Sequence, residues 1–177
     1  MDKLIIGLGN PEEKYAKTKH NIGKEFLDFL SNNSLNQQGN WKKISKLPAE
    51  IKTKNKLGLV KLSAYMNQSG PAIKQLLNYY KLLPERILVI HDDTDLIFGK
   101  VKFTHQSLAA GHHGIESIIR AIGSNQFARI RIGVRPENSE QKAEALVLRK
   151  ITKKEEQIIE QVSFPKALDL TNQWLES

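Results

Sequence analysis

The chain has 177 residues, of which 40% are hydrophobic and 26% are charged, a composition typical of a globular domain with a sizeable core. It contains no cysteine, which excludes disulfide bonds, cysteine nucleophiles and cysteine-ligated metals and favours a cytoplasmic location. The net charge of +8 fits a polyanionic partner such as nucleic acid, and it fits equally well a lysine-rich surface that only contacts water.

Membrane association is not expected from this sequence. The first residues lack the basic, apolar and small-residue pattern of a signal peptide. No apolar run approaches the ~20 residues that a membrane-spanning helix requires. We therefore expect a cytoplasmic protein.

The chain opens with a predicted strand, a glycine turn and a helix. Residues 3–7 are apolar and predict a buried strand, which runs into the turn Gly7-Leu8-Gly9-Asn10-Pro11. This turn does not match a dinucleotide-binding fingerprint, because Glu12 stands where that motif needs its third glycine. Apolar residues at helical spacing over residues 21–31 predict an amphipathic helix.

Short strands are expected next, over residues 41–62, and the clearest of them covers residues 57–62. A helix follows these strands. Ser69 is placed to cap this helix, with Pro71 in its first turn.

The second half of the chain continues the alternation of strands and helices. Residues 86–90 form an almost continuous β run, as in a central strand that is covered on both faces. Residues 111–122 predict a helix and residues 130–134 predict another strand. This alternation favours a single α/β domain over residues 1–177.

The C-terminal part is predicted to be helical after a polar segment. Residues 136–147 are polar and are predicted to form a mobile lid. Thr152 and Glu155 resemble a capping box that opens a helix, and a second helical stretch covers roughly residues 165–175. C-terminal helices are therefore expected over about residues 152–175.

Polar side chains gather at four places where apolar elements begin or end. Because ligands bind at the carboxyl ends of strands in open α/β sheets, we expect these segments to form one site. Each segment taken alone has a plainer explanation as a cap, a turn or a surface group. The four segments are Asn10 with His20 and Asn21; Tyr65 to Gly70; His91 to Asp95; and Gly111 to Gly114.

The chemistry that such a site supports is hydrolysis by activated water. The chain has neither a cysteine nucleophile nor a G-x-S-x-G elbow. A neutral histidine backed by an aspartate can take a proton from water, and asparagine amides can donate hydrogen bonds to the developing oxyanion. A Mg²⁺ site at Asp92, Asp93 and Asp95 is the alternative, because Mg²⁺ prefers carboxylates and water.

Five motifs together resemble the bacterial peptidyl-tRNA hydrolase family, and their order and spacing agree over roughly residues 3–136. The motifs are Gly7-Leu8-Gly9-Asn10-Pro11 with Tyr15 and Thr18-Lys19-His20-Asn21-Ile22-Gly23; Tyr65-Met66-Asn67-Gln68-Ser69-Gly70; His91-Asp92-Asp93-Thr94-Asp95-Leu96; Gly111-His112-His113-Gly114; and Arg129-Ile130-Arg131-Ile132-Gly133-Val134.

The resemblance implies a monomeric, single three-layer α/β domain, in which helices flank a mixed, twisted central β-sheet. It implies hydrolysis of the ester bond between a peptide and the 3′ ribose of tRNA, which recycles peptidyl-tRNA released from ribosomes. Peptidyl-tRNA is then the partner, and neither a metal nor a cofactor is implied.

The resemblance also assigns roles to individual residues. His20 is implied to be the general base, and Asp92 its partner. Lys102 and Arg131 fall at positions that the family uses toward the tRNA phosphates. The substrate-binding positions are Asn10, Tyr15, Asn21, Tyr65, Met66, Asn67, His112 and His113.

Some positions depart from the family pattern. His113 stands where asparagine is usual, Glu12 where glycine is usual, and Lys19 where arginine is usual. Glu12 is therefore expected to give the first turn a different local conformation. A non-catalytic RNA-binding or RNA-processing factor on the same scaffold is the alternative function. The pair of His20 and Asp92 favours the enzyme, because a binding module has no need of both.

Overall fold

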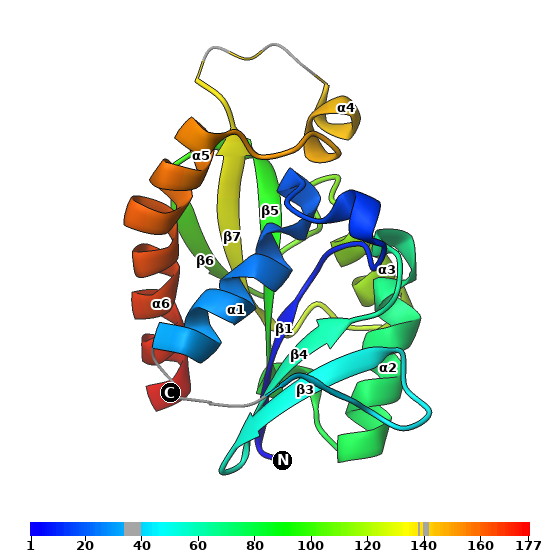
Figure 1. The fold of residues 1–177 in the computed structure, drawn as a ribbon. Helices are drawn as coiled ribbons and strands as arrows, with labels where there is room; N and C mark the ends of the chain where they lie inside the picture. The colour runs from blue at the N-terminus through cyan, green and yellow to red at the C-terminus, as the bar shows by residue number, and fades with distance from the viewer. Residues whose placement is uncertain (34–39, 138, 140–141) are drawn as a thin grey trace.

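The computed structural model describes residues 1–33, 40–137, 139 and 142–177 (Figure 1). Within these ranges, seven strands form one sheet in the order β2-β3-β4-β1-β5-β7-β6. The strands are β1 (Lys3–Gly7), β2 (Lys42–Lys43), β3 (Ala49–Lys54), β4 (Leu57–Leu62), β5 (Ile87–Ile97), β6 (Val101–His105) and β7 (Ala128–Arg135).

The sheet is mixed, as expected. The inner strands β4, β1, β5 and β7 run parallel, whereas β3 and β6 pair antiparallel with β4 and β7. The apolar residues of β1 are completely buried, because helices cover both faces of the sheet centre. Parallel strands place their carboxyl ends along one edge, which is the upper edge in Figure 1. Of the polar segments predicted from the sequence, two follow β1 and β4, a third lies within β5, and the fourth opens α3.

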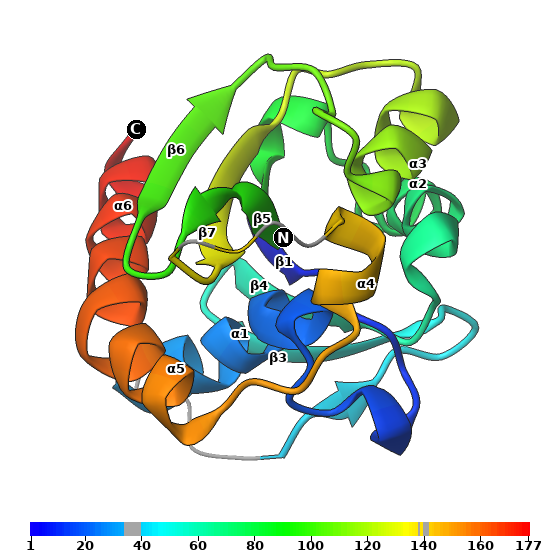
Figure 2. The same cartoon turned by 90° about the horizontal axis from the view of Figure 1, so that it is seen from above.

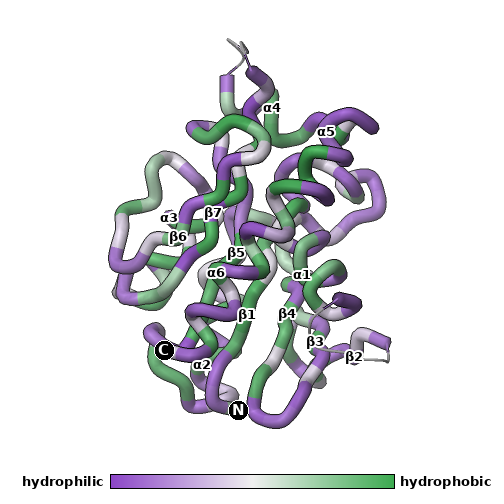
Figure 3. The backbone as a smooth tube through the Cα atoms, turned by 90° about the vertical axis from the view of Figure 1, so that its left-hand side faces the viewer, coloured by the Kyte–Doolittle hydropathy of each residue, from purple (hydrophilic) through white to green (hydrophobic). Residues whose placement is uncertain are grey.

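Helices cover both faces of the sheet and confirm the three-layer α/β fold. Phe26 of α1 and Phe164 of α6 belong to the core of one face, and Leu76 of α2 and Ile118 of α3 to the core of the other. The chain is hydrophobic along β1 and β4 between these layers (Figure 3). Along the described ranges, no helix combines the length and the apolarity that crossing a membrane requires. The helices are α1 (Ile22–Asn33), α2 (Ser69–Tyr80), α3 (His113–Ile122), α4 (Ala143–Val147), α5 (Lys153–Ile158) and α6 (Phe164–Glu176).

Ser69 does not cap α2, so that prediction was wrong. A 3₁₀ turn, Met66–Gln68, runs directly into the helix, and Ser69 already has helical backbone angles (φ −59°, ψ −36°). An N-cap residue needs extended angles, and it is Tyr65, ahead of the turn, that has them.

The strand predicted over residues 86–90 extends to Ile97, so His91 to Asp95 lie within β5 and not after it. The pairing with β7 explains the extension, because His91 and Asp93 lie opposite Arg131 and Gly133. Strand β6 was not predicted; it lies at the margin of the sheet and pairs only with β7.

The C-terminal helices begin as predicted, with Thr152 and Glu155 forming a capping box. Between α5 and α6 the helix widens into a π turn, Ile159–Ser163. Pro165 explains this turn, because it has no N–H for the carbonyl four residues earlier. The N–H of Phe164 instead donates to the carbonyl of Ile159, five residues back.

The predicted lid, residues 136–147, is described in part. Residues 138, 140 and 141 lie outside the described residues. Helix α4 forms the end of this segment, and Leu146 on it is buried. Motion of the segment stays a prediction.

Glu25 on α1 makes the stability of the fold depend on pH. Burial raises the pKa of this carboxyl from its ordinary 4.5 to about 7. Folding therefore favours the protonated form. The contribution of Glu25 to the free energy of unfolding is fully present below pH 4.5 and is lost as the pH rises through 7. We expect the free energy of unfolding to fall by roughly 2–3 kcal/mol on this account between pH 5 and pH 8.

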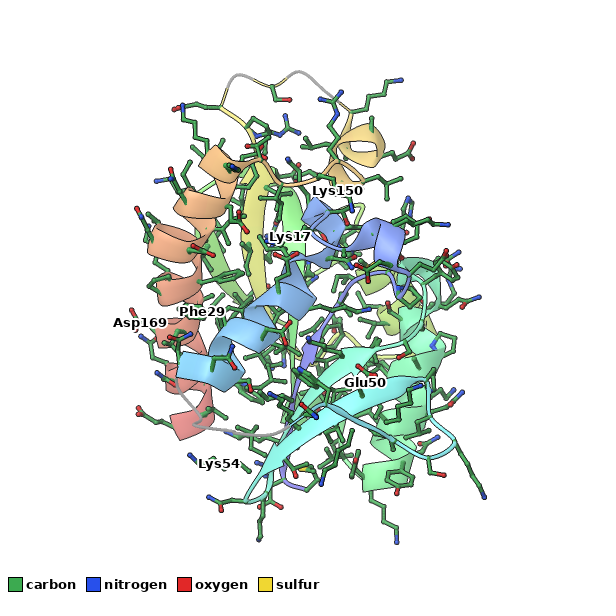
Figure 4. All side chains as sticks on the ribbon, in the orientation of Figure 1. Lys17, Phe29, Glu50, Lys54, Lys150 and Asp169 are labelled. Atoms are coloured by element: carbon green, nitrogen blue, oxygen red, sulfur yellow. The ribbon has the colours of Figure 1, made fainter. Side chains whose placement is uncertain are left out.

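Urea unfolding of Glu25→Gln at the two pH values tests this expectation, because the amide does not titrate. The matched control is Asp169→Asn, an exposed carboxylate on α6 (Figure 4). The control should keep the wild-type pH dependence. A Glu25→Gln variant that loses as much stability between pH 5 and pH 8 as the wild type would contradict the assignment.

Candidate active site

His20 lies in a 3₁₀ turn, Lys19–Asn21, which leads directly into α1 at the upper edge of the sheet. Gly23 allows this helix to approach the strands closely. A Cβ at Gly23 would lie 2.8 Å from the backbone nitrogen of Leu8 and would collide with the carbonyl oxygen of Ile90. The absence of a side chain there brings His20 next to the end of β5.

His20 is bonded to Asp92 of β5. The distance between His20 Nδ1 and Asp92 Oδ1 is 2.8 Å, and both side chains are buried. Because Asp92 accepts the proton of Nδ1, the lone pair of a neutral His20 lies on Nε2. Nε2 makes no hydrogen bond to any described residue. The predicted pair therefore has the geometry of a base and the carboxylate that orients it.

His112 is bonded to the same carboxylate oxygen. Its Nε2 lies 3.1 Å from Asp92 Oδ1, and its Nδ1 accepts from the backbone N–H of Ile115 at 3.3 Å. The ring thus caps α3 while it donates to Asp92. Both nitrogens of His112 are occupied within the protein, so in this structure the ring supports Asp92, and its contact with substrate stays a prediction.

The two imidazoles determine the ionisation of Asp92. Burial by itself would raise the pKa of this carboxyl, but His20 and His112 outweigh burial and hold the pKa well below its usual range. His91 lies behind them, with its ring centroid 4.5 Å from that of His112. Burial and the neighbouring His112 lower the pKa of His91 well below 6.5, so its ring is neutral. Asp92 is therefore the anion among three imidazoles.

A cavity opens beside this cluster, with about 180 Å³ of space for the centres of water-sized groups. Its walls come from the end of β5, the loop before α3, the middle of β7, and α4. Figure 2 looks down on this edge and shows α4 near the 3₁₀ turn of His20 and α3 at the side. The lining residues include His20, His91, Asp92, Leu108, His112, His113, Arg129, Arg131 and Val147.

Asn10 is fixed from two sides. Its Oδ1 accepts from the backbone N–H of Met66 at 2.9 Å. Asn21 uses both polar atoms of its amide on the backbone of Asn10, at 2.8 and 3.0 Å. Asn21 therefore positions Asn10, and its own contact with substrate stays a prediction. With its Oδ1 engaged, Asn10 keeps its Nδ2 as a donor.

The remaining predicted substrate residues lie around this centre but do not line the cavity, except His113. Met66 is buried where α3 begins, since a Cβ on Gly114 would collide with its sulfur. Tyr65 and Tyr15 contact each other edge to face, with centroids 6.5 Å apart. Asn67 is exposed.

The structure shows the surroundings of two residues that depart from the family pattern. Glu12 has ordinary extended backbone angles (φ −79°, ψ 149°), so the turn does not need glycine there, and its carboxylate accepts from the hydroxyl of Tyr65. His113 is exposed, with its Nδ1 3.6 Å from Glu116.

The cations predicted to meet tRNA have different surroundings. Lys102 is exposed on β6, directly opposite Arg131 on β7. Arg131 lines the cavity and is paired with Asp93. Lys19 is buried, and its Nζ lies 3.0 Å from both oxygens of Glu155. Lys19 therefore holds α5 against the turn of His20.

The C-terminal segment also contacts the residues that directly precede the turn of His20. The backbone N–H of Ile151 donates to Lys17, and the Nζ of Lys150 donates to Lys14 and Ala16. Lys17 and Lys150 lie side by side in Figure 4. No local sequence pattern predicts this contact, because the partners are more than 130 residues apart.

A Mg²⁺ site at the three aspartates does not fit the structure. Asp93 faces Arg131 and accepts from the backbone N–H of Asp95, so the carboxylates do not converge on one point. In the described part of the chain, the one group able to hold a metal is His20, Asp92 and His112. Its distances of 2.8 and 3.1 Å are those of hydrogen bonds through a shared oxygen.

The chain is similar to known proteins along most of its length. The family model described as peptidyl-tRNA hydrolase matches residues 4–177. A peptidyl-tRNA hydrolase of Chlorobaculum tepidum is 39% identical over 162 residues, which cover 90% of this chain and 84% of the relative. One from Synechocystis sp. is 37% identical, covering 97% and 86%. The crystal structure of the enzyme from Acinetobacter baumannii superposes with a TM-score of 0.86 at 28% identity, covering 98% of this chain and 88% of that one.

Proposed function

This chain belongs to the peptidyl-tRNA hydrolase family, and on that premise we propose that it hydrolyses the ester of peptidyl-tRNA with His20 as the general base. The observation that carries this assignment is the 2.8 Å bond from His20 Nδ1 to Asp92, which leaves Nε2 unbonded beside the cavity. One chain supplies every group of the site. We therefore propose that it acts as a monomer, in the cytoplasm where ribosomes release peptidyl-tRNA.

The reaction begins when a water molecule lies between His20 Nε2 and the ester carbonyl. Nε2 takes a proton from this water, and the oxygen attacks the carbonyl carbon. The negative charge of Asp92 stabilises the imidazolium that forms. The imidazolium then returns the proton to the departing 3′ oxygen of the ribose. This exchange releases a peptide carboxylate and tRNA and restores the neutral base.

The oxyanion of the intermediate needs hydrogen-bond donors. Asn10 is the best placed of the predicted residues, because Met66 and Asn21 fix it and its Nδ2 remains a donor. Asn67 and His113 are the other candidates, and both are exposed side chains that can move toward a bound substrate. A correctly aimed amide contributes about 10²–10³-fold to such reactions.

A non-catalytic RNA-binding role is not favoured. His20 and Asp92 come from segments 72 residues apart and meet at hydrogen-bond distance beside a cavity. Both relatives and the solved structure named above are described as hydrolases. Binding to tRNA alone does not require this buried pair.

Turnover of peptidyl-tRNA with and without EDTA tests the function and its independence of metal. We expect the rate of peptide release to be unchanged by EDTA when monovalent salt keeps the tRNA folded, because Asp92 and both imidazoles bond to one another. Loss of turnover that added Mg²⁺ restores would contradict the mechanism. Salt-sensitive tRNA binding without any peptide release would instead support the RNA-binding alternative.

A further inference from the structure

Arg129 is a buried cation in the wall of the catalytic cavity. It lies on β7, only 2% of its surface is exposed, and it lines the same cavity as His20 and Asp92. Its Nη2 donates to Ser107 Oγ and to the carbonyl oxygen of Leu108, the latter at 2.9 Å. Neither acceptor carries a negative charge. Nε and Nη1 have no hydrogen-bond acceptor among the described residues.

Arg131, two residues along the same strand, differs from Arg129 because it pairs with the carboxylate of Asp93. Arg129 has no carboxylate within 4 Å among the residues that the structure describes. Burial and the nearby Arg131 lower the pKa of Arg129 to about 10, so it still carries its charge at neutral pH. Asp93 acts on Arg129 only from beyond pairing distance, and a buried charge without a directly paired counter-ion is costly, which indicates that an anionic ligand binds at this wall.

The substrate offers one anion at a fixed place near the reacting bond. The ester is on the 3′ oxygen of the terminal adenosine, and the phosphate on the 5′ oxygen of that adenosine is separated from it only by the ribose. A side-chain carboxylate of the peptide is not equivalent, because peptides differ between substrates. Arg129 lines the same cavity as His20, so the phosphate closest to the ester is the one that can reach this wall.

We propose that Arg129 binds the 5′ phosphate of the terminal adenosine and so positions the ester against His20. This inference rests on the proposed function. Nη2 holds the loop before α3, and Nε and Nη1, on opposite sides of the guanidinium, each keep an N–H that can donate a charge-assisted hydrogen bond to a phosphate oxygen. The competing explanation is that Arg129 only anchors that loop through Ser107 and Leu108.

Two minimal substrates separate these explanations: a peptide ester on the 3′ oxygen of adenosine, and the same ester on adenosine 5′-monophosphate. We expect the wild type to prefer the phosphorylated ester by about 10- to 100-fold in kcat/KM, the range of a charge-assisted hydrogen bond. Arg129→Gln should reduce this preference to near one. Arg129→Lys should keep part of it, because the charge remains but the position of the donors changes.

The matched control is Arg120→Gln, which removes an exposed arginine from α3 and should leave the preference unchanged. The preference is a ratio measured within each variant, so it does not depend on how much of the enzyme is folded. Inhibition of peptidyl-tRNA turnover by adenosine 5′-monophosphate, compared with adenosine, gives the same ratio if the minimal esters react slowly.

An Arg129→Gln variant that slows both esters equally, or a wild type without any preference, would overturn the inference and leave Arg129 as a loop anchor. Either result would leave the proposed function intact. Failure of the wild type to release peptide from peptidyl-tRNA would count against the proposed function itself.

Discussion

Replacing His20 with alanine is expected to lower kcat/KM for peptidyl-tRNA by about 10²–10⁴-fold, the contribution of a positioned general base. The substitution removes the imidazole that bonds to Asp92 through Nδ1 and keeps an unbonded Nε2 beside the cavity, so water is no longer deprotonated there. Affinity for tRNA should be unchanged, because the imidazole acts on the ester and not on the phosphates. Peptide release under single-turnover conditions, together with tRNA binding, measures both quantities.

The control for this variant is His105→Ala, an exposed histidine on the marginal strand β6. It changes the same side chain far from Asp92 along the sheet and should retain wild-type turnover. A His20→Ala enzyme that releases peptide at a near wild-type rate would show that another group is the base.

Asp92→Asn is expected to have the second largest effect, a loss of kcat/KM on the order of 10³-fold. Both imidazoles bond to one oxygen of Asp92, and an amide oxygen at that place can accept both bonds. The orientation of the rings is then kept, and what is lost is the negative charge that stabilises the imidazolium. The loss should therefore be somewhat below the ~10⁴-fold of a triad in which the amide also imposes the wrong tautomer.

Asp95→Asn is the natural comparison for Asp92→Asn. It removes an exposed carboxylate from the same strand, one that makes no bond to an imidazole in the described part of the chain. It should have little effect on turnover. Equal losses in the two variants would indicate a general electrostatic effect or a metal site.

The fold and the catalytic pair could be predicted from the sequence because both depend on local patterns. The apolar run of β1 and the helical spacing of α1 predict the elements, and parallel strands bring their carboxyl ends to one edge. His20 lies directly before α1, and Asp92 comes shortly after the apolar first part of β5. Their direct bond was implied by the family resemblance, since a separation of 72 residues has no local signal.

What the sequence did not predict depends on distant partners. The polar half of β5 is a strand only because β7 pairs with it, and β6 is stable only at the margin of that pair. His112 and His91 have the same side chain, yet one caps α3 and the other is buried behind it. The sequence did not predict that Arg129 lacks a directly paired carboxylate, because this follows from the pairing of Asp93 with Arg131.

The most direct test of the central claim, that Asp92 acts through His20, is kcat/KM of the double variant His20→Ala/Asp92→Asn. If Asp92 acts only through the imidazole of His20, removing its charge should not lower kcat/KM further once the imidazole is absent. The kcat/KM of the double variant should then lie within about threefold of that of His20→Ala. If the two losses multiply instead, Asp92 acts on the substrate independently, and the account of a base held by its carboxylate is wrong.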